Sequence, residues 1–423
     1  MPIYRLLLIL SLATAPWAPV ALSAQTSPGT GAQSGAEAQT GPGTGAESHL
    51  EVARQVLATT PLIDGHNDLP WVIYTDPHAP GDVDAYDLRS TTPGHTDLER
   101  LRAGMVGAQF WAVFAPPEAV EEGAVRVLLE VLDLTQRMIS LYPEHLELAL
   151  SVSDVERIFG AGRVASILGM EGGHALENSL GVLRVLFETG IRYLTLTHNN
   201  TTDWADSATD EPRHGGLSPF GVEVIREMNR LGMLADLSHV SDGTMSHVLN
   251  VSEAPVIFSH SSARALTDHP RNVPDSILRR MPENGGVVMV TFVPFFVNEE
   301  VLRYEEAPHA LPEEAPRATL EDVADHIDHV RGVAGVDHVG IGSDFDGFPS
   351  SPIGLEDVST FPALFAELSR RGWTEEELRK LAGENLLRAW REAEAVARRI
   401  QRERGPSRAT IQELDGGAGS SGP

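Results

Sequence analysis

The chain has 423 residues, of which 42% are hydrophobic, and its 60 acidic and 32 basic side chains give a net charge of −28. This composition supports a large hydrophobic core, and the acidic balance argues against binding to nucleic acid or to anionic membrane surfaces. The absence of cysteine excludes disulfides, thiolate metal sites and cysteine nucleophiles, so any metal ion must be held by His, Asp or Glu.

Residues 1–24 predict a secretory signal, with a short basic start, an apolar core and small residues near the end. Two prolines interrupt the apolar stretch, which favours an exported protein, periplasmic or extracellular, over one that keeps a membrane anchor. Residues 25–48 are rich in Gly, Thr, Ser, Ala and Gln and predict a flexible linker. We expect the folded domain over 49–404 and a disordered tail over 405–423.

Short apolar runs bounded by Gly, Pro and Asn predict buried parallel strands at 62–66, 107–114, 163–170, 192–198, 233–239, 255–260, 286–292 and 338–343. Helical patterns lie between them, and one is opened by Ser218 as N-cap and Pro219 at the first helical position. Eight alternations of strand and helix predict an α/β fold, a (β/α)₈ TIM barrel of the metal-dependent hydrolase type. The acidic, proline-rich segment 297–320 follows the seventh strand and is either a lid over the barrel mouth or a passive insertion.

Acids and histidines stand where these runs end, and a (β/α)₈ barrel builds its active site from such positions. His66 and Asp68 are two residues apart after the first run, so they face the same way. Glu171 ends the third run and can bridge two cations, while His239 and His260 end the fifth and sixth. We therefore predict two ions, one held by the first pair with Glu171 and one by Glu171 with the two later histidines. A water between them would become the nucleophile as a metal-bridging hydroxide.

Three further side chains are candidates for substrate handling. Asp344 ends the eighth run and is placed to pass a proton from the attacking water to the leaving amine, with Asp346 as the alternative. His198 ends the fourth run and is placed to polarise a substrate carbonyl. Arg271 is placed either to clamp a free carboxylate by two parallel hydrogen bonds or to form a structural salt bridge. We expect surface positions for the histidines around the helix that precedes the eighth strand, His326, His329 and His338.

The runs DGHND, MEGG, LTLTHN, LSHVS, FSHSSARAL, HPRNVPD and GIGSDFDG resemble, in this order, those of membrane (renal-type) dipeptidases, a branch of the amidohydrolase superfamily. The later stretch WTEEELRKLAGENLLRAW resembles the closing helix of that family. The resemblance implies a barrel with two zinc ions that hydrolyses dipeptides with an L residue first and an L or D residue second. It also implies the same roles for the same residues: five metal ligands with Glu171 bridging, His198 on the carbonyl, Arg271 on the substrate carboxylate and Asp344 as acid and base.

Two alternatives remain at this point. The first is another amidohydrolase-type enzyme that acts on a lactone, a β-lactam or an amide. Many of these bridge two metals through a modified lysine, whereas the one lysine here, Lys380, lies outside every predicted strand. The second is a catalytically silent metal-binding scaffold, which would lack a ligand, although none is missing. The expected partners are dipeptide substrates, without nucleic acid or a stable membrane anchor, and a noncovalent homodimer is compatible with the sequence.

Overall fold

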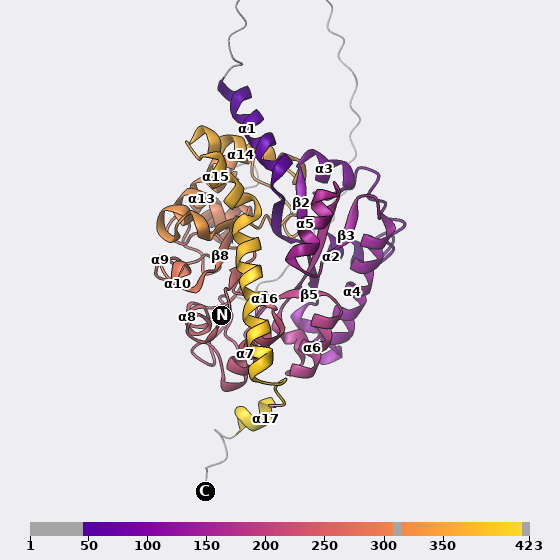
Figure 1. The fold of residues 1–423 in the computed structure, drawn as a ribbon, viewed down its shortest axis with the longest axis vertical. Coiled ribbons are helices and arrows are strands. Elements are labelled where there is room, and N and C mark those ends of the chain that lie inside the picture. The colour runs from indigo at the N-terminus through magenta and orange to yellow at the C-terminus, as the bar shows by residue number, and fades with distance from the viewer. Residues whose placement is uncertain (1–44, 308–314, 417–423) are drawn as a thin grey trace, which may run out of the picture. The chain divides into compact units, whose positions relative to one another are not determined.

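The computed structural model describes residues 45–307 and 315–416, and Figure 1 shows their fold. The predicted signal segment 1–24 and residues 25–44 of the predicted linker lie outside the described residues. The strands are β1 (Leu62–Asn67), β2 (Val106–Phe114), β3 (Leu146–Leu148), β4 (Val164–Glu171), β5 (Ile191–Thr195), β6 (Leu234–Asp236), β7 (Ile257–Phe258), β8 (Val287–Val290) and β9 (Val339–Ile341).

The strands close into a parallel barrel. Neighbours pair in the order β2-β1-β9-β8-β7-β6-β5-β4, and β2 pairs with β4 to complete the ring. All carboxyl ends therefore meet at one rim, which confirms the predicted (β/α)₈ barrel. The predicted strands run up to three residues past the observed ends, because the polar residues at the rim leave the ladder and turn toward one another.

The short strand β3 is absent from the sequence prediction. It pairs with the first half of β4, from Leu146 opposite Val164 to Leu148 opposite Ser166. The second half of β4 pairs with β5, starting at Leu168. Three residues are too few to show a strand period in the sequence, so this addition to the barrel edge could not be recognised there.

Helices surround the ring of strands and complete the α/β alternation. Their bounds are α1 (Gly45–Thr59), α2 (Leu69–Tyr74), α3 (Leu98–Ala103), α4 (Ala124–Leu141), α5 (Val152–Gly160), α6 (Leu180–Glu188), α7 (Pro219–Leu231), α8 (Asp242–Val251), α9 (Asp275–Leu278), α10 (Met281–Asn284), α11 (Pro294–Val297), α12 (Glu299–Glu306), α13 (Leu320–Ala334), α14 (Phe361–Arg370), α15 (Glu375–Arg379), α16 (Asn385–Glu403) and α17 (Ile411–Leu414). The predicted start of α7 is confirmed, because Ser218 Oγ accepts a hydrogen bond of 3.2 Å from Gly221 N and Pro219 is the first helical residue.

Two layers of core hold this arrangement together. The larger layer packs the outer faces of the strands against the surrounding helices. The smaller layer contains buried side chains from the strands together with residues of α16: Ile63, Ala108, Phe110, Ala165, Ile167, Tyr193, Leu234, Ile257, Val287, Met289, Leu386, Leu387 and Trp390. In Figure 1 the long helix α16 runs in front of the strands. The stretch that resembles the closing helix of the family, residues 373–390, covers α15, the π-helical turn Lys380–Glu384 and the first residues of α16.

The sequence prediction of a disordered tail is wrong for residues 405–416. Helix α17 forms there behind a capping box at Thr410. The carboxylate of Asp415 then accepts hydrogen bonds from Ser218 Oγ at 2.7 Å and from Phe220 N at 3.0 Å, at the start of α7. The linker prediction also ends too late, because α1 begins at Gly45. The sequence analysis missed the start of α1 and the whole of α17 because both segments are polar. Their order comes from helix capping and from docking on the barrel, which the apolar content of a sequence does not reveal.

Two of the three histidines expected on the surface are buried. His326 is 1% exposed, and His338 is 9% exposed, while His329 lies at an intermediate depth. The ring of His326 faces inward from α13, where its Nδ1 accepts from Ala263 N at 3.0 Å. The prediction failed because a histidine that meets backbone partners is compatible with the core side of a helix.

The segment that follows β8 folds into two short helices as far as it is described. Asn298 caps α12, and its Oδ1 accepts from Glu300 N at 2.9 Å and Val301 N at 3.1 Å. Its side-chain amide also donates to Asp322 Oδ1 of α13 at 3.1 Å, which ties the segment to the barrel. A lid function for 297–320 stays a prediction, and residues 308–314 lie outside the described part of the chain.

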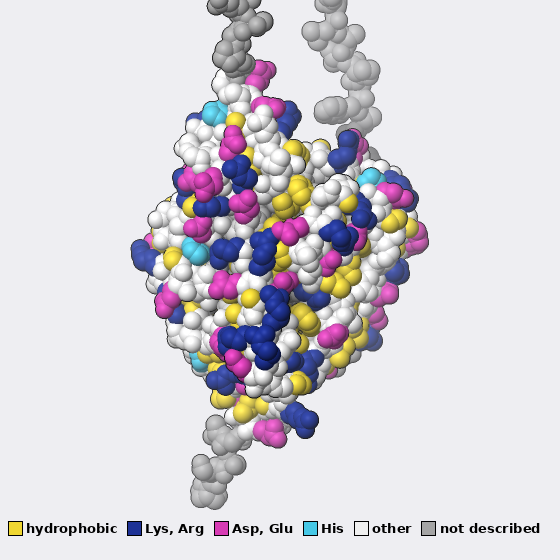
Figure 2. All heavy atoms as spheres, viewed as in Figure 1, with side chains coloured by type: hydrophobic (Ala, Val, Ile, Leu, Met, Phe, Trp, Pro, Cys, Tyr) yellow, Lys and Arg dark blue, Asp and Glu magenta, His cyan; other side chains and the backbone are white. Residues whose placement is uncertain are grey.

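The surface over α16 is basic although the whole chain is acidic. Figure 2 shows basic side chains gathered along this helix, and those that belong to α16 are all arginines. Several are paired, as in the ion pair of Arg391 with Glu156 and that of Arg399 with Glu253 at 2.7 Å.

Among the described residues, no helix combines the length and the apolar character needed to cross a bilayer.

Candidate active site

The acids and histidines predicted from the strand ends lie together at the carboxyl rim of the barrel. His66 belongs to the end of β1, and Glu171 is the last residue of β4. The other cluster members follow β1, β5, β6, β7 and β9 within three residues: Asp68, His198, His239, His260 and Asp344. The barrel closure thus brings residues that are up to 278 positions apart, from His66 to Asp344, into one cluster.

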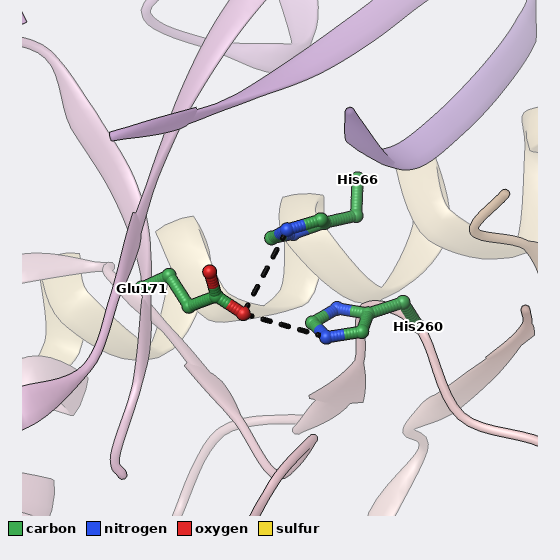
Figure 3. Close-up of side chains that lie close together, drawn as sticks. All are labelled: His66, Glu171 and His260. Atoms are coloured by element: carbon green, nitrogen blue, oxygen red, sulfur yellow. Dashed lines mark ion pairs between the residues drawn. The ribbon is translucent and has the colours of Figure 1, made fainter. Parts of the chain in front are cut away.

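One oxygen of Glu171 is the centre of this cluster. Oε1 lies 3.8 Å from His66 Nε2, 3.1 Å from His239 Nε2 and 3.5 Å from His260 Nε2. Figure 3 shows how Glu171 points between His66 and His260, which come from different strands. Asp68 is also part of the cluster, with Oδ2 3.5 Å from His66 Nε2. A carboxylate oxygen this close to three imidazole nitrogens lies at the centre of a set of side chains that could bind metal.

The donor atoms are close enough to hold metal ions. In the described part of the chain, three overlapping groups have ligand atoms within 4.8 Å of one another: His66 with Glu171 and His260, Glu171 with His198 and His239, and His66 with Asp68 and Asp344. The groups cross the boundaries of the two predicted ligand sets, because the whole cluster is compact. The buried Nε2 of His66 has no hydrogen-bond partner among the described residues, as expected for an atom that a cation would bind. The residues therefore fit a metal centre.

The charges of the cluster also favour a cation. Burial alone lowers the pKa of His66, but the carboxylates of Asp68 and Glu171 raise it to about 10. Burial raises the pKa of Glu171 to about 7. Burial lowers the pKa of both His239 and His260 well below the usual range, so these two rings are neutral, as metal ligands must be. A divalent cation on Nε2 of His66 would replace the proton that this acidic surrounding holds there.

Two cluster members adopt strained backbone conformations. His239 has φ 69° and Asp344 has φ 68°, in the left-handed region that non-glycine residues rarely occupy. Such strain costs of order 1–3 kcal/mol per residue and persists where the surroundings impose it. Ala208 N and Thr197 Oγ1 both donate to the carbonyl of His239, at 2.8 Å and 3.1 Å, and so hold that residue in place. The sequence carries no signal for this strain.

Comparison with known proteins identifies the family of this chain. The family model of the membrane dipeptidases (peptidase family M19) matches residues 50–404. This chain belongs to the membrane dipeptidase family. It is 42% identical to dipeptidase verJ of Clonostachys rogersoniana over 364 residues, which cover 84% of this chain and 89% of that relative.

Solved structures agree with this membership of the dipeptidase family. The probable dipeptidase PvdM from Pseudomonas aeruginosa superposes with a TM-score of 0.74 at 26% identity, over 83% of this chain and 100% of that chain. A metallo peptidase from Rhodobacter sphaeroides, liganded with a phosphinate mimic of the dipeptide L-Ala-D-Ala, superposes with a TM-score of 0.68 at 27% identity, over 79% of this chain and 99% of that one. The chain is therefore a metallo-dipeptidase, a hydrolase that acts on peptide bonds.

Arg271 of this dipeptidase lies beside the cluster with its guanidinium largely free. It is 3% exposed, and burial lowers its pKa to about 10, within the range where it stays charged at neutral pH. Its Nη1 makes one long hydrogen bond of 3.5 Å to Ser261 Oγ, and its guanidinium lies 5.3 Å from the ring of Phe296. Within residues 45–307 and 315–416 no carboxylate forms an ion pair with it. This arrangement favours the predicted carboxylate clamp over the structural salt bridge.

His198 lies beside the cluster, with its ring centroid 4.5 Å from that of His239 and 4.9 Å from that of Phe114. Burial lowers its pKa to about 3, so the ring is neutral and keeps one N–H to donate. Its Nδ1 is buried without a hydrogen-bond partner in the described chain. A substrate oxygen can therefore be the missing partner of this imidazole.

The structure also separates the two candidate acids of the loop after β9. Asp344 has a carboxylate oxygen within the group that includes His66 and Asp68. Asp346 instead accepts a hydrogen bond of 2.6 Å from His95 N, away from that group. A Cβ at Gly347 would lie 2.4 Å from Asp68 Oδ2 and 2.6 Å from Asp344 Oδ1, so the next turn of this loop packs directly on both acids. Burial raises the pKa of Asp344 well above its usual range, which suits a group that gains and loses protons.

Sequence reasoning missed the residues that contact the far side of the cluster histidines, at Nδ1. The phenol of Tyr193 lies 2.8 Å from His66 Nδ1, and the hydroxyl of Ser259 lies 2.7 Å from His260 Nδ1. Both contacts place a polar group behind a ring whose Nε2 faces Glu171. The position of Ser259 directly before His260 is the one signal that the sequence offers, and a lone serine is too common to use.

Proposed function

We propose that the cluster holds two zinc ions and hydrolyses dipeptides that carry an L residue first and an L or D residue second. One ion would be held by His66, Asp68 and Glu171, and the other by Glu171, His239 and His260. The observation that carries this proposal is the Glu171 oxygen within 3.8 Å of three imidazole nitrogens from separate strands. Histidine and carboxylate ligands without cysteine suit zinc, and other divalent ions bind the same donor set.

Substrate orientation follows from the two groups beside the cluster. We infer that the guanidinium of Arg271 binds the free carboxylate of the dipeptide by two parallel hydrogen bonds. The neutral ring of His198 donates a hydrogen bond to the oxygen of the scissile carbonyl, which gains negative charge during attack. Binding a free carboxylate one residue beyond the scissile bond limits the substrate to two residues. The dipeptide mimic bound to the Rhodobacter sphaeroides metallo peptidase supports a D residue in the second position.

Proton transfer is assigned to Asp344. Divalent cations at such a site supply an activated water and polarise the scissile carbonyl. The carboxylate of Asp344 accepts a proton from the attacking water and delivers it to the nitrogen of the leaving amine. The position of Asp344 beside His66 and Asp68, together with the raised pKa of its carboxyl group, supports this role.

The test joins a metal count to an assay. We would determine zinc per chain by elemental analysis and measure cleavage of L-Ala-D-Ala and L-Ala-L-Ala before chelation, after chelation and after zinc is restored. About two ions per chain with chelator-sensitive cleavage would support the proposal. Two ions without dipeptide cleavage would move the function to another amide or a lactone substrate. A protein that binds no metal under any loading condition would overturn the two-ion site.

We also propose that the protein acts outside the cytoplasm after removal of residues 1–24, and that it works without a stable membrane anchor. The support is the charge and apolar pattern of the N-terminal sequence. N-terminal sequencing of the protein recovered from periplasmic and culture fractions tests this, and an intact N-terminus in the cytoplasmic fraction would contradict it. A noncovalent homodimer is proposed on the same footing and is tested by the molar mass in solution.

A further inference from the structure

A carboxylate outside the predicted ligand set reaches the site through one serine. Ser259 Oγ lies 2.6 Å from Asp236 Oδ2 and 2.7 Å from Nδ1 of His260. Asp236 is the last residue of β6, and all three side chains are at most 1% exposed. The chain of contacts thus runs from a strand end of the barrel, through one hydroxyl, to the ring of a predicted metal ligand.

The direction of each hydrogen bond can be assigned from the donor inventory. Asp236 receives four donors, namely Thr195 Oγ1 at 2.5 Å, Ser259 Oγ at 2.6 Å, Ser259 N at 2.8 Å and Ser238 N at 3.1 Å. A serine hydroxyl has one proton, and here it goes to the carboxylate. The oxygen of Ser259 must then accept from His260, so Nδ1 of this ring carries the hydrogen and Nε2 is left with its lone pair. That lone pair belongs to the nitrogen 3.5 Å from Glu171 Oε1.

We propose that Ser259 and Asp236 are positioning residues for the metal centre, which fix the tautomer and the ring orientation of His260. The inference rests on the proposed function, since it concerns the second of the two ions. His239, the other histidine of that ion, has a buried Nδ1 without a partner in the described chain. The Asp236–Ser259 pair is therefore the support on which this second position depends. Losing such a support lowers metal affinity 10- to 100-fold in comparable sites.

A matched control exists elsewhere at the same rim. Asp64 of β1 accepts from Ser343 N at 2.6 Å and from Ser343 Oγ at 2.6 Å, just as Asp236 accepts from both groups of Ser259. In each pair the aspartate lies on one strand and the serine follows the neighbouring strand. Ser343 Oγ, however, contacts no imidazole ring in the described chain; its other contacts are with the backbone, at 3.2 Å from Phe345 N and 3.5 Å from the carbonyl oxygen of His66. The two pairs share the clamp between strands and differ in the contact to a ligand ring.

The experiment compares Ser259→Ala with Ser343→Ala. Both variants are loaded with zinc, and the affinity of each ion is measured by competition with a chromogenic chelator, while thermal unfolding records the loss of the shared clamp. We expect Ser259→Ala to bind one of its two ions 10- to 100-fold more weakly, with the other unchanged. Ser343→Ala should lose comparable thermal stability but keep both affinities. Substitution with Co²⁺ gives a second readout, in which the visible absorption bands of one ion change in Ser259→Ala and stay unchanged in Ser343→Ala.

The outcomes are distinguishable. Equal losses of affinity in the two variants, or none in either, would overturn the positioning role, because Ser259 contacts the ring of a predicted metal ligand and Ser343 does not. A wild-type protein that binds fewer than two ions would instead contradict the proposed two-ion site. If Ser259→Ala fails to fold, Asp236→Asn keeps the volume and two acceptor contacts on the remaining oxygen. It should show the same selective loss of one ion, and retention of both affinities would reject the inference.

Discussion

The two ends of the barrel are built differently. At the carboxyl rim, buried polar groups are crowded together, and His66 Nε2, His198 Nδ1 and His239 Nδ1 lack hydrogen-bond partners in the described chain. The backbones of His239, Asp344 and Asp346 are left-handed there. At the amino end, α16 meets the strands through a packed apolar layer that includes Trp390 and Phe110. The rim is arranged for chemistry at a cost in stability. The amino end with the α16 layer, here called the floor, supplies stability and carries none of the cluster residues.

Hydrogen bonds also join α16 to the amino ends of the strands. Asn385 Nδ2, at the start of α16, donates to the carbonyls of Val336 at 2.7 Å and Val339 at 2.9 Å, which precede and begin β9. Arg388 Nη1 donates to Gly285 O at 2.8 Å, just before β8. These bonds to the amino ends of two strands hold α16 across the base. The contrast teaches that a change at the rim should alter rate or metal binding, and a change at the floor should alter stability.

The largest expected effect is on catalysis, from Asp344→Asn. General acid–base groups contribute about 10²- to 10⁴-fold, so kcat for L-Ala-D-Ala should fall by that factor. Zinc content and the thermal midpoint should remain near those of the parent, because an amide fills the same volume. The matched control is Asp346→Asn, in the same loop with the same φ of 68°. If Asp346→Asn instead shows this fall in kcat and Asp344→Asn retains most of its activity, the roles of the two acids are reversed.

The opposite end is tested by Trp390→Ala. This ring is 1% exposed and lies 6.3 Å between centroids from Phe110, so its removal should leave a cavity and lower the free energy of unfolding by about 3–5 kcal/mol. Denaturant titration measures the loss, and kcat below the unfolding transition should be unchanged. Arg391→Ala, at the next position on the exposed side of α16, removes only a surface ion pair and should cost about 1 kcal/mol or less. A fall in kcat of the folded Trp390 variant would contradict the division between floor and rim.

The barrel and its rim could be predicted from the sequence because both leave periodic or positional signals. Strand runs end in functional residues, and His66, Glu171 and His260 were found through that rule alone. The supports behind them could not be found in the same way. Asp236 and Ser259 are far apart in the sequence, and their contact exists only because β6 and β7 are neighbours in the closed barrel. Register and closure, which depend on the whole fold, decide such contacts.

His326 of α13, which the sequence analysis expects on the surface, is buried for the same reason, because its contacts depend on the whole fold. Its burial also leads to a prediction about pH. His326 accepts at Nδ1 from Ala263 N and lies 3.2 Å from Val297 O at Nε2, which fixes a neutral ring. Burial lowers its pKa to about 4, below the ordinary 6.5. Between these values the unfolded chain binds a proton that the folded chain excludes. The free energy of unfolding should therefore fall by about 3 kcal/mol as the pH drops from 6.5 to 4. Above pH 6.5 the ring is neutral in both the folded and the unfolded chain, so His326 causes no further pH dependence there.

Chemical denaturation at several pH values measures this slope against that of His326→Gln. Glutamine can accept from Ala263 N and donate to Val297 O without titrating, so the variant should lose less stability over the same pH interval. The difference between the two proteins isolates this ring from other titrating groups. Identical pH slopes would show that His326 does not contribute, and would assign the acid sensitivity to other groups of the fold.

The smallest expected effect lies at the docked C-terminal segment. Asp415→Ala removes the acceptor for Ser218 Oγ and Phe220 N at the start of α7, where a negative charge also interacts favourably with the helix dipole. We expect a loss of about 1 kcal/mol in the free energy of unfolding, with kcat unchanged. Glu413→Ala, in the same short helix, breaks the capping box of α17 and is the control for unfolding of that helix alone. A loss with Asp415→Ala that exceeds the control would show that α17 stabilises the barrel by docking on α7, and equal small losses would confine its effect to its own helix.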